Sequence, residues 1–343
     1  MRFRTNLSVF ALKAILRRSF LASIATLGLT CPAQAADSQT PFYMPDVTDK
    51  AALKKGLMQF AKEPNNEQVF YLAVQCYLSD RDFKTAHLTV LNAAKAHPDW
   101  ASPFYFQALE AEQMLNDADA LRCYANCYKA NPAWMKVAIQ YAEALRLDYK
   151  YRQAIVKCNE ALAICAHAPT DKRVKRDVKA LKQIKAQSYF DLRSYPQAIE
   201  VLTEMTRGER DLPAESLLAR ACVGGAKYEQ AIKVSTRTLA LYPNDSYTRF
   251  ARASAYVALK ESDKAMADLD YMLAHNVKET NHPTNDLRIE SNVRTLRLSI
   301  FKSRGDRKSA IQEIATLKKL TSESYQDTPF QHHSRESRPP QGF

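Results

Sequence analysis

The side chains that could do chemistry are scattered along this chain, and their spacing matches no catalytic or metal-binding motif. Seven histidines and seven cysteines occur in 343 residues, but there is no Cys-x2-Cys or His-x3-His pair of the kind that a zinc site uses. There is also no G-x-S-x-G motif, no P-loop and no dinucleotide fingerprint. The sequence therefore predicts a protein that is not an enzyme and that uses no cofactor or metal.

A cluster of basic residues is the strongest charged feature. Val174, Val178, Leu181 and Ile184 share one helical face, and cations occupy the remaining positions. The cations are Lys172, Arg173, Lys175, Arg176, Lys179, Lys182 and Lys185. Such a helix could contact an anionic membrane surface or envelope polymer, or it could simply be solvated.

The overall charge does not favour nucleic acid. The formal net charge is +12, and five of the basic residues lie in the first 35 residues, which contain no acid. The remaining 44 basic and 37 acidic residues leave a modest surplus, far from the dense basic stripe of a nucleic-acid-binding protein. No nucleic-acid partner is expected.

The first 35 residues have the three-part layout of a secretory signal peptide. A basic segment precedes the apolar run Phe20–Thr30, and Ala33-Gln34-Ala35 is a small-x-small cleavage site. The apolar run is too short to span a bilayer. Arg17-Arg18-Ser19-Phe20-Leu21 resembles the twin-arginine export signal, and general secretion is the alternative. We therefore expect export, cleavage after Ala35, and a periplasmic or secreted protein.

Two interlocked residue series reveal a repeat with a period of 34. Ala52, Ala86, Ala120 and Ala154 are spaced by 34 residues, as are Ala231 and Ala265. Pro64, Pro98 and Pro132 repeat with the same period, each 12 residues after its alanine. Aromatic residues recur at fixed places between them, such as Phe70, Tyr77 and Phe83 in the unit that starts near residue 67.

With this pattern the chain resembles the tetratricopeptide repeat family, whose unit is a 34-residue helix-turn-helix. The resemblance implies an all-α fold, a right-handed superhelical solenoid of stacked helix-turn-helix units. One helix pair cannot bury its own apolar face, whereas stacked pairs bury it continuously. We expect a linker at 36–46, a solenoid at 47–320 with a capping helix and about seven repeats, and a disordered tail at 321–343.

Two insertions interrupt the period. Ala154 and Ala198 are 44 residues apart, and Ala265 and Ala310 are 45 apart. The extra residues fall in 167–178, which predicts either a loop or a lengthened helix, and in the polar segment 275–285, which predicts a loop.

Six cysteines remain after the predicted cleavage. Cys123 and Cys127 are one helical turn apart, and Cys158 and Cys165 lie on the equivalent helix of the next unit. Cys127 and Cys158 stand where the family has small or medium core residues, which favours buried free thiols. Disulfides between neighbours are the alternative for an exported protein.

The resemblance also implies a binding surface, because tetratricopeptide proteins hold a partner segment in a concave groove lined by the first helix of each pair. Projecting the inward faces of these helices gives a mixed lining of aromatics, amides and charges. The predicted groove residues are Gln68, Tyr71, Gln75, Tyr105, Lys136, Glu143, Arg146, Gln183, Gln187, Phe190, Arg220, Tyr247, Phe250, Asn292 and Lys302. Some of these positions could instead serve ordinary packing.

The sequence thus predicts a non-enzymatic scaffold in the cell envelope that binds a protein or peptide partner in this groove. Aromatic side chains with one apolar body and one polar end suit peptide contacts. The alternative is an electrostatic binder of anionic polymer or membrane surface that acts through residues 172–185.

Overall fold

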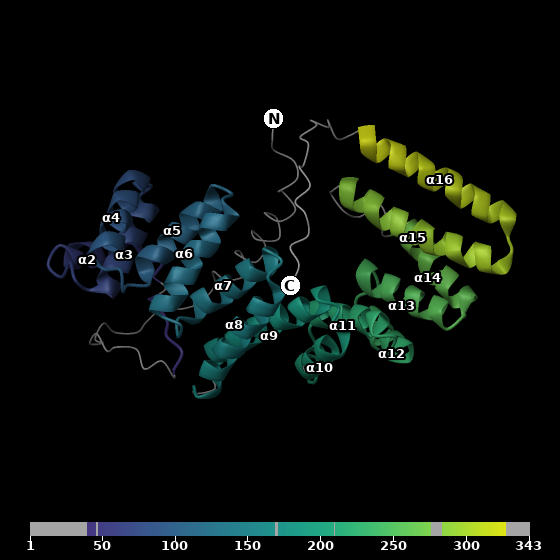
Figure 1. Ribbon diagram of the computed structural model, residues 1–343, viewed down its shortest axis with the longest axis horizontal. Coiled ribbons are helices and arrows are strands. Elements are labelled where there is room, and N and C mark those ends of the chain that lie inside the picture. Colours follow the sequence, from purple (N-terminus) through teal and green to yellow (C-terminus); the bar gives the residue numbers. More distant parts are fainter. Residues whose placement is uncertain (1–39, 46, 169–170, 209, 276–282, 327–343) are drawn as a thin grey trace, which may run out of the picture. The chain divides into compact units, whose positions relative to one another are not determined.

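The computed structural model describes residues 40–45, 47–168, 171–208, 210–275 and 283–326 (Figure 1). These residues belong to one compact unit, Ser38–Phe343. The predicted signal peptide and the part of the expected tail beyond residue 326 lie outside the described residues.

Within these ranges the structure is built from helices, as predicted from the repeat. A first helix, α2 (Lys50–Phe60), precedes seven helix pairs. We call the first helix of each pair the A helix and the second the B helix. The pairs are α3 (Glu67–Ser79) and α4 (Phe83–Ala96); α5 (Ser102–Gln113) and α6 (Asp117–Ala130); α7 (Met135–Leu147) and α8 (Tyr151–Ala166); α9 (Lys172–Asp191) and α10 (Tyr195–Met205); α11 (Leu212–Gly224) and α12 (Tyr228–Leu239); α13 (Ser246–Ala258) and α14 (Ser262–His275); α15 (Pro283–Arg304) and α16 (Arg307–Gln326). The all-α prediction is confirmed.

The turn inside each pair follows one local rule. A residue with a positive φ follows each A helix, as the second residue after the first six A helices and as the first after α15, for example +63° at Arg81, +58° at Leu115 and +62° at Tyr149. The amide of the next residue then donates to a carbonyl in the last turn of the helix, as from Asp82 N to Tyr77 O at 2.9 Å. This is the Schellman arrangement, which ends a helix and reverses the chain. Among the seven turns only the one after α15 has glycine, Gly305, at the positive-φ position, which agrees with the scarcity of glycine in the sequence.

Short polar side chains start many of the helices. The Asn66 side chain accepts hydrogen bonds from the amides of Gln68 and Val69 at the start of α3, and Asp82 caps α4 in the same way. These contacts satisfy amide donors that have no partner inside the helix. Side-chain capping thus marks where these helices begin, and the left-handed turn residue marks where the A helices end.

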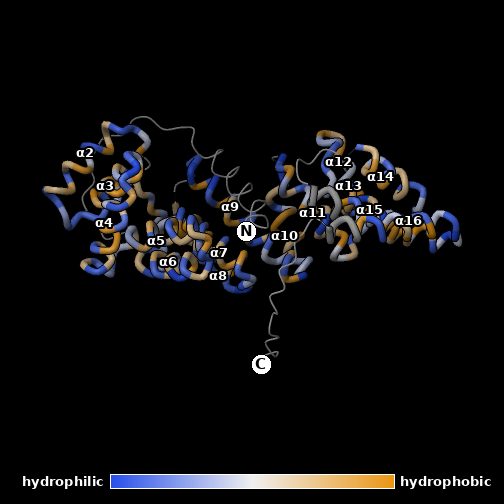
Figure 2. Tube along the Cα trace, turned by 90° about the horizontal axis from the view of Figure 1, so that it is seen from above, coloured by the Kyte–Doolittle hydropathy of each residue, from blue (hydrophilic) through white to orange (hydrophobic). Residues whose placement is uncertain are grey.

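Stacking of the pairs depends on small residues where helices cross. Each B helix contacts its own A helix and the A helix of the next pair. The recurring alanines found in the sequence are buried at these crossings, namely Ala86, Ala120, Ala154, Ala198, Ala231, Ala265 and Ala310. Hydrophobic and hydrophilic residues alternate along the helices, as Figure 2 shows, so each helix buries one stripe against its neighbours.

In each of the last two pairs, a buried carboxylate on the B helix pairs with arginines of its own A helix. The two carboxylates occupy equivalent positions. Asp268 on α14 pairs with Arg249 and Arg252 of α13 at 3.1 and 2.6 Å. Glu313 on α16 pairs with Arg294 and Arg297 of α15 at 3.1 and 2.6 Å. Each acid therefore receives two guanidinium groups from successive turns of its A helix. The 45-residue offset between the two clusters matches the irregular period in the sequence.

The insertions are accommodated differently from each other. The first one lengthens a helix, because α9 has 20 residues and α8 has 16. For the second, α14 ends at His275 and α15 begins at Pro283, so residues 276–282 of the expected loop lie outside the described residues and 283–285 are helical. Helix α16 also extends to Gln326, beyond residue 320, where the solenoid was expected to end.

We predict that Ala154→Leu lowers the free energy of unfolding by about 2 kcal/mol, because three extra carbons must enter a packed helix crossing. Ala163→Leu is the matched control, since Ala163 lies on the same helix but is exposed. It should change stability by less than about 0.5 kcal/mol. Urea titration followed by circular dichroism measures both. Equal effects of the two substitutions would contradict the role given to the crossing.

We predict that Asp268→Asn lowers the free energy of unfolding by about 3 kcal/mol, because it leaves two largely buried guanidinium groups without a charged partner. Asp263→Asn on the same helix is the control. Its side chain is 97% exposed and pairs only with Arg304, so its loss should cost well under 1 kcal/mol. Thermal melts of both variants decide the point, and a small effect at Asp268 would show that the buried cluster contributes little.

Candidate functional site

The A helices form a layer of neighbours that carries every predicted groove residue. α3 contacts α5, α7 contacts α9, and α9, α11, α13 and α15 contact one another in sequence. The 15 side chains selected by helical projection all lie on these A helices. We refer to this set of helices as the A layer.

The first two aromatic residues predicted for the groove are buried. Tyr71 of α3 and Tyr105 of α5 are 2% and 3% exposed, and their rings lie 5.9 and 4.9 Å from the ring of Trp134. The sequence suggested that both would line an open groove. In the structure a partner cannot reach them, because other residues of the chain cover them. Gln68 and Gln75 are partly exposed, and Lys136 is exposed with its ammonium 5.2 Å from the Tyr105 ring centroid.

Residues 40–45 contribute to this cover, and we call them the N-terminal segment. The amide of Phe42 donates to Ala133 O at 2.7 Å, and the amide of Met135 donates to Phe42 O at 3.3 Å. The Phe42 ring meets Trp134 edge to face. Met44 is buried in the same cluster as Tyr71 and Tyr105. Part of the expected linker at 36–46 thus packs against the helices.

The middle of the A layer carries a hydrogen-bonded charge cluster from α7 and α9. The Arg146 guanidinium donates to both carboxylate oxygens of Glu143 at 2.7 and 2.9 Å and to Asp191 at 3.2 Å. Gln187 donates to the other oxygen of Asp191 at 2.9 Å. The hydrogen bond to Glu143 is the main reason that the pKa of Arg146 is raised. The projection found three of these four residues and missed Asp191.

Farther along, three predicted residues from three A helices meet. The Arg220 guanidinium of α11 lies 4.7 Å from the Phe190 ring centroid of α9 and 5.4 Å from the Tyr247 ring centroid of α13. Among the described residues, no carboxylate pairs with Arg220. Tyr247 is 49% exposed, so solvent reaches the cluster. The cation is therefore held by two aromatic faces while its N–H edges keep their donor capacity.

The remaining predicted positions do not join this cluster. Phe250 packs partly buried beside the core formed by α13, α14 and α15, and Gln183 is half-buried on α9. Asn292 and Lys302 are exposed on α15.

The basic face of α9 is largely engaged inside the molecule. Lys179 pairs with the buried Asp211 at 2.8 Å, and Lys182 pairs with Glu204 at 2.7 Å. The other internal contacts are Arg173 over the Tyr43 ring, Arg176 with Asp177, and Lys185 near the Tyr189 ring. Lys172 and Lys175 at the start of α9 remain exposed without such a contact to a described residue. The face therefore offers far less free positive charge than its sequence suggests.

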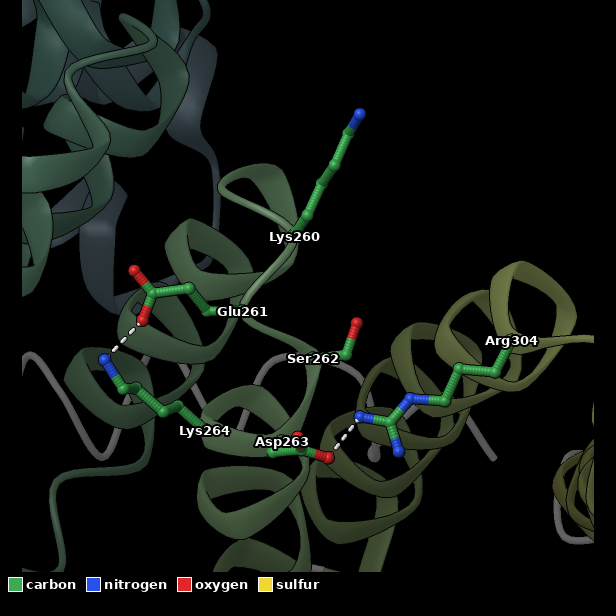
Figure 3. Close-up of a pocket in the computed structure, with 6 residues that line it drawn as sticks. All are labelled: Lys260, Glu261, Ser262, Asp263, Lys264 and Arg304. Atoms are coloured by element: carbon green, nitrogen blue, oxygen red, sulfur yellow. Dashed lines mark hydrogen bonds and ion pairs between the residues drawn. The ribbon is translucent and has the colours of Figure 1, made fainter.

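A shallow hollow at the α13–α14 turn is a poor alternative site. It is lined by Ser262 and by five charged residues, Lys260, Glu261, Asp263, Lys264 and Arg304. Figure 3 shows that Glu261 pairs with Lys264 and that Asp263 pairs with Arg304. None of the residues that line the hollow has an apolar side chain on which a ligand could pack.

Within the described ranges, no group of three or more His, Cys, Asp or Glu side chains could hold a metal ion. Every helix in the same ranges is too short or too polar to cross a bilayer.

The six cysteines of the described chain are buried and free. Cys127 and Cys158 are fully buried at helix crossings, and Cys165 Sγ lies 3.4 Å from Met135 Sδ. Burial raises the pKa of Cys165 and of Cys222 to about 11, and that of Cys158 to about 12. Thiols in such surroundings act as small apolar groups.

The helix pairs and their stacking are those of the tetratricopeptide fold. A tetratricopeptide repeat protein from Parabacteroides merdae superposes with a TM-score of 0.50 at 12% identity, covering 78% of this chain and 93% of its own. The Cut9–Hcn1 complex of the APC/C matches 79% of this chain and 50% of its own at 16% identity and a TM-score of 0.47. YrrB, described as a tetratricopeptide protein with an unusual peptide-binding site, matches 53% of this chain and 89% of its own at 14% identity and a TM-score of 0.43. No family model and no curated protein sequence matches the chain.

We predict that the six thiols of the protein expressed as residues 36–343 do not react with Ellman's reagent at pH 8 until the protein unfolds. Their raised pKa values keep them protonated at this pH, and burial blocks access. The measurement is thiol release in buffer and in 6 M guanidinium chloride. Rapid reaction of several thiols in buffer would contradict the packing described here, and fewer than six thiols in denaturant would indicate disulfides.

Proposed function

We propose that the protein is an exported interaction scaffold of the cell envelope, and that it binds a segment of a protein partner along the A layer. The single observation that carries the proposal is the Arg220 guanidinium held between Phe190 and Tyr247 with no carboxylate beside it. The leader sequence supports the location, and the tetratricopeptide fold supports the role.

The geometry of this cluster suits an acidic group on the partner. A guanidinium stacked on aromatic faces keeps its planar N–H edge free, and that edge matches a carboxylate in a bidentate pair. The aromatic rings exclude water from one side of the pair, which strengthens it. An aspartate or glutamate side chain, or a chain-terminal carboxylate, fits these requirements.

The neighbouring cluster of Arg146, Glu143, Asp191 and Gln187 would add polar selectivity. Both acids are already paired with Arg146, so the cluster carries one uncompensated negative charge. A partner segment with an acidic group at Arg220 and a donor such as lysine or an amide toward α7 would satisfy both clusters. The charges therefore suggest an orientation for the bound segment as well as a position.

We predict that Arg220→Ala reduces capture of the partner at least tenfold and that Arg220→Lys recovers little of it. Loss of the charged hydrogen bonds accounts for this size of effect, and lysine lacks the planar fork. The tagged chain without its leader is incubated with envelope extract of its own source, and bound proteins are quantified by mass spectrometry. Phe190→Ala and Tyr247→Ala should each reduce capture of the same partner protein.

Arg122→Ala is the matched control, because Arg122 is exposed on a B helix and pairs only with Asp119 in its own helix. It should leave capture unchanged. If the same proteins bind equally to the wild type, Arg220→Ala and Arg122→Ala, the A layer is not the binding surface.

The alternative function, electrostatic attachment through residues 172–185, gives a different result in the same experiment. Binding of that kind would disappear by about 0.5 M salt, where the Debye length is only a few ångströms, and would depend on Lys172 and Lys175. Capture that survives high salt and depends on Arg220 would favour the peptide-binding scaffold.

A further inference from the structure

The N-terminal segment binds the A layer in the manner of a peptide ligand. It is extended, and Phe42 forms a parallel backbone bridge with Trp134. Both backbone groups of Phe42 are used in this bridge, one as donor to Ala133 and one as acceptor from Met135. Pairing of an extended segment through its backbone is a recurrent mode of peptide recognition.

Successive side chains of the segment enter different surroundings. Phe42 meets Trp134, whereas the next residue reaches α9. The Tyr43 hydroxyl donates to Asp177 Oδ2 at 2.9 Å, and the Arg173 guanidinium stacks over the Tyr43 ring at 4.7 Å. Met44 is buried with the aromatic residues of α3 and α5. Three consecutive side chains are therefore each recognised by separate groups of the helices.

The surface that receives the segment is assembled by the helices themselves. Tyr71, Tyr105 and Trp134 come from three successive helix pairs and contact one another directly. Asp177 is a buried carboxylate whose hydrogen-bond partners are the Tyr43 hydroxyl and the neighbouring Arg176. Burial raises the pKa of Asp177, and the Tyr43 hydrogen bond is the largest opposing contribution. An aromatic floor and a buried acceptor at its edge are the parts of a site for an aromatic–tyrosine segment.

We propose that this surface is a binding site for an extended segment with an aromatic residue, a tyrosine and an apolar residue in succession, and that residues 40–45 are its exchangeable intramolecular occupant. The inference rests on the proposed function, since it names a second kind of segment for the same A layer. A partner that carries such a sequence would displace residues 40–45 and gain the Phe42 and Tyr43 positions. Until then the tethered segment keeps the aromatic floor covered.

The test uses a fluorescein-labelled peptide with the sequence of residues 38–47 and the full chain without its leader, with binding followed by fluorescence anisotropy. The wild type should bind the peptide weakly, because its own segment competes at high effective concentration. The Phe42→Ala/Tyr43→Ala variant releases the site, so it should bind the peptide at least tenfold more tightly. A peptide with phenylalanine in place of Tyr43 should bind this variant about tenfold more weakly, because Asp177 loses its hydroxyl donor.

Phe83→Ala/Tyr149→Ala is the matched control, because these two residues are of the same types and are 61% and 79% exposed, at the start of α4 and in the α7–α8 turn. It should bind the peptide as weakly as the wild type does. Tyr43→Phe in the full chain removes one hydroxyl only, and it should bind the peptide several-fold more tightly than the wild type. If Phe42→Ala/Tyr43→Ala does not fold, Tyr43→Phe decides the outcome.

A folded Phe42→Ala/Tyr43→Ala variant that binds the peptide no better than the control would overturn the proposal and would make residues 40–45 a permanent part of the core. Wild-type affinity in a folded Tyr43→Phe variant would do the same. Failure here is distinguishable from failure of the proposed function, because partner capture through Arg220 depends on α9, α11 and α13 and involves none of the substituted residues.

Discussion

Close approach of helices at small residues is the constraint on which the rest of this structure depends. A pair such as α7 and α8 exposes an apolar stripe that it cannot cover alone, so its stability comes from the pairs on either side. That contact requires alanine at the crossing, and it recurs wherever the sequence places Ala86, Ala120, Ala154 and their equivalents. Because each interface is local, an insertion that lengthens a helix, as in α9, is tolerated without loss of the next crossing.

The same constraint separates the surface that can vary from the surface that cannot. B helices are pressed between two A helices, so their inward positions are committed to packing. Each A helix also contacts the helices before and after it as well as its A neighbours, so only its side chains outside these contacts are free to differ from pair to pair. This explains why the A layer holds an aromatic floor at α3 and α5, a hydrogen-bonded charge cluster at α7 and α9, and a stacked guanidinium at α11. The helix pairs are therefore repeated along the chain, whereas the side chains exposed on the A layer differ from pair to pair.

The sequence repeat predicted the features that the helix pairs share. It missed contacts that residues outside the repeat, or on different helices, make with one another. The buried alanines follow from the recurring small residues, and the positions of Phe190, Arg220 and Tyr247 on three A helices follow from projecting the inward face of each predicted A helix. Burial of Tyr71 and Tyr105 does not, because the residues that help to cover them lie outside the repeat and bind through backbone groups that leave no signal in residue types. Pro41 and Pro45, which flank Phe42-Tyr43-Met44, were the only signal in the sequence for this segment, since prolines favour an extended chain. Asp191 was missed because the projection selected single helix faces and its partner Arg146 belongs to another helix.

The net charge of +12 illustrates why composition alone could not identify the partner. Two of the seven cations on the basic face of α9, Lys179 and Lys182, pair with acids outside that helix, and the arginines of α13 and α15 enclose Asp268 and Glu313. Cations used in this way hold pairs together and offer little to a ligand. Arg220 is different because two aromatic rings, and no acid, surround it. Its hydrogen-bonding capacity is therefore left for another molecule, which gives Arg220 more consequence for binding than the cations that are already paired with acids.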